Sequence, residues 1–304
     1  MKIFNKDKKI KLNLFNTIIF IVLVAYAFTL FFALYWMITA SLKTDKEIVS
    51  GNFFGLPKEW LFKNFVTALR VFEYQTPEGE IVKLLPTYGY SGLDYGIIIN
   101  TLLYTVGGAF CATIVPCFVA YVVAKFDYKV SKILYGAVIV TMILPIVGNY
   151  PSMVNVMYEL NLYDTFLGNW LQKANFLGLY FLIFYAGYKS LPNDYMEAAY
   201  IDGATEWRVL LRIMFPLMRT IFLTIMVIHF VDIWNDYQTV LLYLPSHPTI
   251  AFSVYMRATS TESGSAGTEI KMASCMVMVI PTVLIFILFK DRLMGNLSMG
   301  GIKG

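Results

Sequence analysis

The chain contains few charged residues and few of the side chains that commonly carry catalysis. Only 14% of its 304 residues are charged and 58% are hydrophobic, whereas about a quarter of the residues in soluble domains are charged. The sequence has no G-x-x-x-x-G-K-[ST] loop with which to cradle nucleotide phosphates. This composition excludes an ordinary soluble domain and predicts a polytopic membrane protein.

Cysteine and histidine are equally scarce. Cys111, Cys117 and Cys275 lie in apolar runs without C-x-x-C spacing, which favours packing over a disulfide framework. The only two histidines, His229 and His247, have no cysteine or carboxylate at a metal-ligand spacing. For His229 we favour a hydrogen-bonded interior position. We therefore predict no catalytic residues, no metal site and no cofactor.

The sequence contains several long apolar runs. About 20 apolar residues are needed for a helix to cross the hydrocarbon core of a bilayer. The fourth run is short and must borrow residues from its flanks. The sequence therefore predicts an all-α polytopic membrane protein with six transmembrane helices, at roughly residues 14–40, 97–124, 133–157, 176–190, 214–234 and 272–289.

The basic residues predict that both termini are cytoplasmic. With six crossings and an inner N-terminus, 15 of the 24 Lys and Arg residues lie on the inner side. Six of the other nine lie in the long 41–96 loop, where membrane insertion is least sensitive to charge. Only Lys173, Arg257 and Lys271 are left in the shorter outer loops.

Polar and aromatic residues gather in two of the predicted spans. Ionisable groups at membrane depth are costly and usually face the bundle interior or a wet cavity. Aromatic faces beside amides and carboxylates would suit a polyhydroxylated solute, although an interfacial aromatic belt explains the fifth-span cluster, with Asp236 in it, equally well. The candidate substrate-pathway residues are Asn149, Tyr150 and Asn155 in the third span, and His229, Asp232, Trp234, Asn235 and Tyr237 in or beside the fifth.

Residues 197–216, "EAAYIDGATEWRVLLRIMFP", lie between two very apolar parts of the chain. Arg208 and Arg212 lie four residues apart on one side of a predicted helix. The i, i+3, i+4, i+7 spacing of the apolar residues defines another face. The pattern predicts a surface helix that needs a partner, with an apolar stripe of Trp207, Leu210, Leu211 and Met214.

The same segment resembles the EAA loop, E-A-A-x3-G-x9-I-x-L-P, of the membrane subunits of binding-protein-dependent ABC importers. Phe215 replaces the leucine of that motif. Further segments resemble the smaller membrane subunit of the maltose-type carbohydrate importers, in the family's order. They include "SLKTDKEI" (41–48), "AYVVAKFDYKVSKIL" (120–134), "WNDYQTVLLYLP" (234–245) and "LSMGGIKG" (297–304).

This resemblance implies a five-helix type I importer core, an additional N-terminal helix and a cytoplasmic pair of EAA coupling helices. Residues 1–96 would hold the first transmembrane helix and an extracytoplasmic loop. Residues 97–304 would form the permease core, with the EAA loop at 194–216 and a cytoplasmic C-terminal tail.

The resemblance also implies a function and partners. It implies a permease that forms half of the pathway of an ATP-driven carbohydrate importer, favouring an oligosaccharide, in the prokaryotic cytoplasmic membrane. The implied partners are a second permease subunit in a heterodimer, two cytoplasmic ATPase subunits and an extracytoplasmic solute-binding protein.

In the EAA loop we expect two short helices, 197–202 and 204–214, with a glycine at the reversal between them. One apolar stripe would pack on the permease, and the remaining surface would dock in a groove of the ATPase. The implied coupling residues are Glu197, Ala198, Ala199, Gly203, Trp207, Ile213 and Pro216.

The sequence leaves three alternatives. A secondary solute carrier would also have polar residues in its spans, but it offers no use for the helix pair. A non-catalytic structural subunit of another membrane complex and a membrane enzyme are the others.

Overall fold

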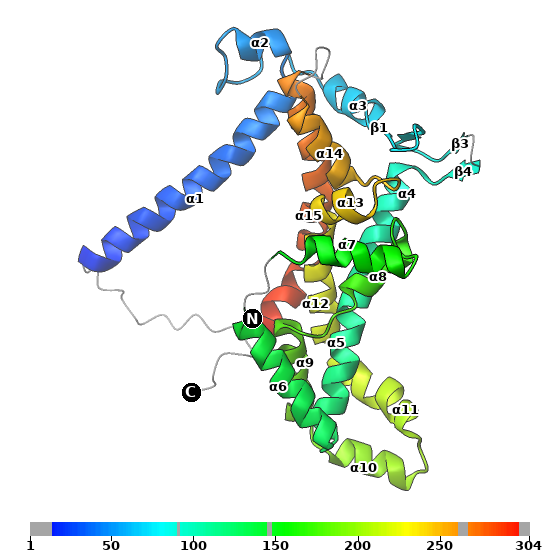
Figure 1. Ribbon diagram of the computed structural model, residues 1–304. Helices are drawn as coiled ribbons and strands as arrows, with labels where there is room; N and C mark the ends of the chain where they lie inside the picture. Colours follow the sequence, from blue (N-terminus) through cyan, green and yellow to red (C-terminus); the bar gives the residue numbers. More distant parts are fainter. Residues whose placement is uncertain (1–13, 90–91, 145–147, 261–266, 298–304) are drawn as a thin grey trace. The chain divides into compact units, whose positions relative to one another are not determined.

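The computed structural model describes residues 14–89, 92–144, 148–260 and 267–297 (Figure 1). The chain divides into two compact units. The first comprises Met1–Ala68 with Ala266–Met276, and the second comprises Leu69–Ser265 with Val277–Gly304. The predicted C-terminal tail, 298–304, and the basic N-terminal residues lie outside the described residues.

The first unit contains a long apolar helix and a polar anchor at its end. α1 (Leu14–Ser41) is followed by α2 (Asp45–Val49) and by the start of α3 (Lys63–Arg70). The buried Asn64 amide donates to the carbonyl oxygens of Ser41 and Lys43, at 2.9 and 2.7 Å. Because Ser41 is the last residue of α1 and Lys43 lies two residues beyond it, the two bonds fix α3 to the end of that helix.

The second unit begins with two small hairpins. β1 (Glu73–Gln75) pairs antiparallel with β2 (Ile81–Lys83), and β3 (Thr87–Gly89) pairs with β4 (Gly92–Asp94). They occupy part of the loop that was predicted to be extracytoplasmic.

The rest of the second unit is helical. Two π-helical turns, η1 and η2, interrupt otherwise continuous α-helices. In chain order the helices are α4 (Gly96–Leu102), η1 (Leu103–Gly107), α5 (Gly108–Lys125), α6 (Lys129–Ile143), α7 (Tyr150–Glu159), α8 (Phe166–Lys173), α9 (Leu179–Ser190), α10 (Asp194–Ile201), α11 (Glu206–Val209), η2 (Leu210–Met214), α12 (Phe215–Trp234), α13 (Gln238–Tyr243), α14 (Ile250–Thr259) and α15 (Thr268–Leu297), which begins in the first unit.

The core of the second unit lies where α5, α9 and α12 meet. Small residues permit this close approach: a Cβ on Gly187 would lie 2.4 Å from the Met218 side chain. Cys117 is fully buried there, with its sulfur 3.3 Å from the Tyr188 hydroxyl. The cysteine therefore packs in the core, as predicted from its apolar neighbours.

Four helices in the described residues are long and apolar enough to cross a membrane: Phe15–Ser41, Gly96–Lys125, Glu206–Trp234 and Thr268–Lys290. These correspond to the first, second, fifth and sixth predicted spans. The third predicted span is not one helix, because α6 ends at Ile143 and α7 begins at Tyr150. Gly148 takes a φ of +83° between them, and a proline opens α7, so the helix cannot continue. The fourth predicted span is the 12-residue α9.

Candidate functional site

The chain reverses direction at Gly203, between α10 and α11. Gly203 has a φ of +76°, a conformation that costs glycine little. Its N–H donates to the Tyr200 carbonyl at 3.0 Å, and the Ala204 N–H donates to the Ala199 carbonyl at 2.9 Å. This pair of bonds is a Schellman motif, which ends a helix with a glycine. The predicted reversal at Gly203 is confirmed, although α10 starts at Asp194 and α11 only at Glu206.

The apolar stripe of this segment divides between two faces. Leu210 and Met214 are buried in the core around α5, as predicted, but Trp207 is 67% exposed and Leu211 is 51% exposed. The buried face instead includes Val209. Successive residues of a helix are about 100° apart around its axis, so a buried face centred on Val209, Leu210 and Met214 leaves Trp207 and Leu211 at its exposed edge. The prediction that the whole apolar stripe packs on the core is therefore wrong for Trp207 and Leu211.

The other motif residues also fall into two groups. Glu197, Ala198 and Pro216 are exposed, whereas Ala199 is buried and Ile213 packs partly buried against the same core. The helix pair lies at one end of the second unit (Figure 1). It is attached by its buried side and presents Glu197, Trp207 and Leu211 outward.

A second polar cluster centres on Asp236, just beyond α12. Its Oδ2 atom accepts from the Lys173 ammonium at 2.9 Å and from the Tyr104 hydroxyl at 2.8 Å. Its Oδ1 atom accepts from the Thr239 N–H at 3.0 Å. Burial alone would raise the pKa of Asp236, but Lys173 and the bonds from Thr239 outweigh it and hold the pKa below its ordinary value. Asp236 is therefore ionised, and its carboxylate connects Lys173 of α8 and Tyr104 of η1 to the segment after α12.

α8 also contacts the π-helical turn η1. The Trp170 indole N–H donates to the Leu103 carbonyl at 3.0 Å. Widened turns disturb the regular hydrogen-bond series of a helix, and a side chain here supplies a donor to the first carbonyl of the turn. Gly107 is required beside it, since a Cβ there would lie 2.3 Å from the Trp170 ring.

His229 occupies the wall of a small cavity. Its Nδ1 atom lies 2.9 Å from the Thr113 hydroxyl, and its ring meets Tyr180 edge-on at 4.4 Å. The cavity, of about 200 Å³, is also lined by Lys173 and Asn175. Because the Thr113 hydroxyl donates its only proton to the Ala109 carbonyl, its oxygen accepts from Nδ1–H of His229. The interior, hydrogen-bonded position predicted for His229 is confirmed.

The other candidate pathway residues do not join His229 in one site. Trp234 is only 7% exposed and donates from its indole to the Met278 carbonyl at 3.0 Å, so it packs α12 against α15. Tyr237 stacks on Tyr255 at 4.1 Å. Asn235 bonds the Val231 carbonyl within its own chain segment. The remaining residues have exposed side chains: Asp232 on α12, and Asn149, Tyr150 and Asn155 at the start of α7 or within it.

Sequence reasoning missed the contribution of α8. The sequence identifies Lys173 only as a charge in an outer loop, and it gives no separate role to Trp170. A cation three residues from a tryptophan, just before an apolar run, was the one available signal. No sequence pattern paired that cation with Asp236, 63 residues away.

Comparison with known proteins identifies relatives over most of the chain. Residues 112–298 match the family described as "Binding-protein-dependent transport system inner membrane component". The diacetylchitobiose uptake system permease protein NgcG of Streptomyces coelicolor is 23% identical over 274 residues, covering 88% of this chain and 82% of its own. The melibiose/raffinose/stachyose import permease protein MelC of Bacillus subtilis is 27% identical over 209 residues, covering 68% and 75%.

Two further matches extend over nearly the whole chain. The trehalose transport system permease protein SugB of Mycobacterium tuberculosis is 23% identical over 282 residues, covering 90% of this chain and 98% of its own. The crystal structure of a bacterial ABC transporter involved in the import of the acidic polysaccharide alginate contains a chain with the same fold. Its TM-score is 0.71 at 20% identity, with 91% of this chain and 96% of that chain covered. The predicted all-α membrane fold of type I importers is thereby confirmed.

Proposed function

Because the chain belongs to the family of binding-protein-dependent transport system inner membrane components, we propose that it forms half of the pathway of an ATP-driven oligosaccharide importer. It is a multi-pass permease subunit and not an enzyme. The energy for transport comes from separate ATPase subunits, in keeping with a sequence that has no phosphate-binding loop.

The names of the relatives support a carbohydrate substrate. Diacetylchitobiose, raffinose, stachyose and trehalose are all sugars of two or more units, and they are named for relatives that cover two thirds or more of this chain. Deleting the gene should abolish uptake of one labelled oligosaccharide class and leave amino acid uptake intact. The reverse pattern would refute the substrate assignment.

The coupling surface is the exposed side of α10 and α11, and one observation carries this proposal. The Schellman turn at Gly203 holds two short helices at one end of the unit with Trp207 and Leu211 outward. Large apolar side chains at an aqueous surface favour burial against a protein partner. We assign that partner as a groove of the ATPase subunit.

The connection from α11 to the membrane is continuous. α11, η2 and α12 together form the helix Glu206–Trp234. Because Val209, Leu210 and Met214 are packed in the core, movement of the docked ATPase would displace α12 with α11 instead of bending the link.

The proposed assembly contains this chain and a second permease as a heterodimer, two ATPase subunits on the cytoplasmic side and one extracytoplasmic solute-binding protein. The permease core, 97–304, would supply the contacts with the ATPases through the loop 194–216. The segment 1–96 would add the first helix and an outer loop. Purification through a tag on this chain should recover one second permease and two ATPase copies.

The proposed topology has six spans, with α6 and α9 as the two short ones, and both termini in the cytoplasm. Within the second unit, Lys125, Lys132 and Lys189 lie near Asn193, at the start of the coupling helices, which agrees with the excess of basic residues on cytoplasmic sides. A cysteine at position 200 should be labelled only from the inside and one at position 260 only from the outside. Labelling of position 200 in intact cells would contradict this topology.

The proposed pathway residues remain Asn149, Tyr150, Asn155, His229, Asp232, Trp234, Asn235 and Tyr237. Among them His229 has the best support, because it lines a cavity with Lys173 and Asn175. Trp234 would act by holding α12 against α15, since its ring is buried. His229→Ala should reduce sugar uptake with normal assembly, whereas Trp234→Ala should reduce assembly as well.

A further inference from the structure

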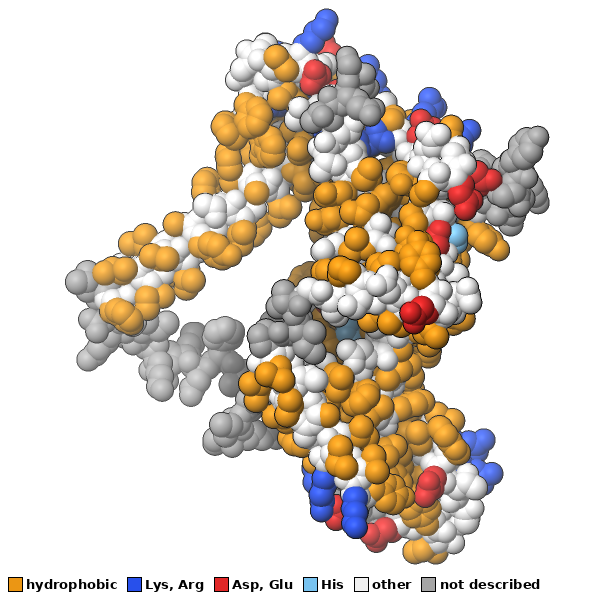
Figure 2. All heavy atoms as spheres, viewed as in Figure 1, with side chains coloured by type: hydrophobic (Ala, Val, Ile, Leu, Met, Phe, Trp, Pro, Cys, Tyr) orange, Lys and Arg blue, Asp and Glu red, His pale blue; other side chains and the backbone are white. Residues whose placement is uncertain are grey.

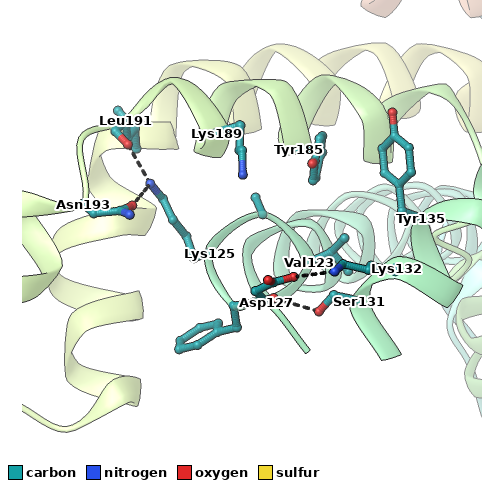
Figure 3. Close-up of a pocket in the computed structure, with 12 residues that line it drawn as sticks. Val123, Lys125, Asp127, Ser131, Lys132, Tyr135, Tyr185, Lys189, Leu191 and Asn193 are labelled. Carbon is teal, nitrogen blue, oxygen red and sulfur yellow. Dashed lines mark hydrogen bonds and ion pairs between the residues drawn. The ribbon is translucent and has the colours of Figure 1, made fainter. Parts of the chain in front are cut away.

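A basic hollow lies between the ends of α5, α6 and α9, at the same end of the second unit as the coupling helices. Its volume is about 710 Å³. Figure 3 shows Lys189 and Tyr185 pointing from α9 toward it, with the side chains of the α5–α6 connection opposite. None of the coupling or pathway roles proposed above uses this hollow.

The lysines around the hollow are held in different ways. The Lys125 ammonium donates to the Leu191 carbonyl at 2.6 Å and to the Asn193 side chain at 2.9 Å. Lys132 pairs with Asp127 at 3.3 Å, but both side chains are largely exposed, so water weakens that pair. In the described part of the chain, Lys189 has no hydrogen-bond or ion-pair partner, and its charge repels that of Lys125.

The hollow therefore carries excess positive charge. Three lysines and one aspartate line it, which leaves two positive charges uncompensated. Figure 2 shows Lys and Arg side chains at this end of the second unit, with Asp and Glu side chains beside them. An anion with several acceptor oxygens would relieve the repulsion between Lys125 and Lys189.

Two tyrosines also line the hollow. Tyr135 of α6 and Tyr185 of α9 meet with their ring centroids 4.9 Å apart. Outside the hollow, the later part of α6 exposes the apolar side chains of Val140 and Ile143. Tyrosine rings at the level of lipid head groups, followed by apolar side chains, match a ligand with a polar head and an apolar tail.

We propose that this hollow binds the phosphate head group of an anionic phospholipid, with its acyl chains along α6. Basic pockets between transmembrane helices on the cytoplasmic side are suited to such head groups. The inference rests on the proposed cytoplasmic position of the coupling helices. Free inorganic phosphate shares the head-group chemistry, but it would gain nothing from the apolar surface of α6.

The test uses the full chain, purified with the subunits that accompany it, in vesicles of equal phosphatidylglycerol and phosphatidylcholine. After extraction, native mass spectrometry measures the ratio of the two lipids that stay bound. The wild type should retain phosphatidylglycerol preferentially. The double variant Lys132→Gln/Lys189→Gln should lower the ratio roughly five-fold for each charge removed.

Lys129→Gln is the matched control, because Lys129 is an exposed lysine of the same helix that does not line the hollow. It should leave the ratio unchanged. Equal retention of both lipids by the wild type, or an equal fall in the control, would overturn the proposal independently of how the double variant folds. Protection of Lys189 from acetylation by inorganic phosphate, but not by phosphatidylglycerol, would assign a free anion instead.

Sugar uptake by the wild type is measured separately. An absent lipid preference with intact uptake would reject the lipid site and leave the transport proposal standing. Absent sugar uptake with a retained lipid preference would reject the transport proposal and leave the lipid site standing.

Discussion

The Lys173 ammonium lies 2.9 Å from the Asp236 carboxylate and joins α8 to the segment between α12 and α13. The Tyr104 hydroxyl donates to the same carboxylate oxygen, so three separate helical segments meet at one side chain. Both partners of the ion pair are mostly buried, with side-chain exposures of 16% and 20%. Removing one partner would leave a poorly solvated charge behind.

We expect Asp236→Asn and Lys173→Gln each to lower the free energy of unfolding by about 1–3 kcal/mol. The double variant should lose less than the sum of the two, because each single variant already breaks the pair. Thermal unfolding of the four proteins in the same detergent measures this coupling. Strictly additive losses would show that the pair makes no net contribution.

The stability that Asp236 contributes should depend on pH. Its pKa in the folded protein lies below the ordinary 3.8, despite the opposing effect of burial, because of Lys173 and the Thr239 bonds. A lowered folded-state pKa adds stability that is fully present above the ordinary value and is lost as pH falls through the folded value. The gap in unfolding temperature between wild type and Asp236→Asn should therefore be constant at neutral pH and shrink below pH 3.8. A gap that widens with acid would contradict this.

The contact of α8 with η1 gives a separate prediction. Trp170→Phe removes the indole donor to the Leu103 carbonyl and should cost about 1 kcal/mol of stability. Gly107→Ala places a methyl group against the same ring and should cost about 1–3 kcal/mol. Gly136→Ala is the matched control, since a Cβ there meets nothing within 4 Å. Equal unfolding temperatures for the two alanine variants would show that Gly107 is not needed for packing.

Sequence predicted the features that depend on local patterns. Apolar runs predicted the four helices that are long and apolar enough to cross a membrane, because length and hydropathy are properties of consecutive residues. The reversal at Gly203 was also predictable, since only glycine takes a positive φ readily.

Features that depend on tertiary contacts could not be predicted from local sequence patterns. Helical periodicity placed Trp207 on one face with Met214, but the orientation of the helix against α5 decided which edge of that face is buried. The sequence places Trp234 among the candidate pathway residues, but its indole donates to the Met278 carbonyl on α15. The Lys173–Asp236 pair joins residues that no periodicity connects.

Gly203→Val tests the turn between the coupling helices. Open space surrounds the position, so the cost is backbone strain alone, about 1–3 kcal/mol. The variant should insert in the membrane and pair with its partner permease, but it should retain fewer ATPase subunits. Gly203→Asn should be milder, because asparagine tolerates this backbone conformation better than valine. Normal ATPase retention by the valine variant, measured after purification, would show that the turn is dispensable.

The exposed residues of α11 separate docking from folding. Trp207→Ala removes an outward side chain and should weaken ATPase retention without lowering the stability of the permease. Arg208→Ala, on a neighbouring exposed position, should have a smaller effect. Equal effects of the two changes would argue against docking through Trp207.

We propose that residues 197–216 couple this permease to a separate ATPase. The most direct measurement is ATP hydrolysis by the reconstituted complex when sugar-loaded binding protein is added. We expect clear stimulation for the wild type and Arg208→Ala, and loss of stimulation for Gly203→Val with its membrane helices intact. A Gly203→Val complex with normal stimulation and normal ATPase content would contradict it, and this segment would then be only a helix at the membrane surface.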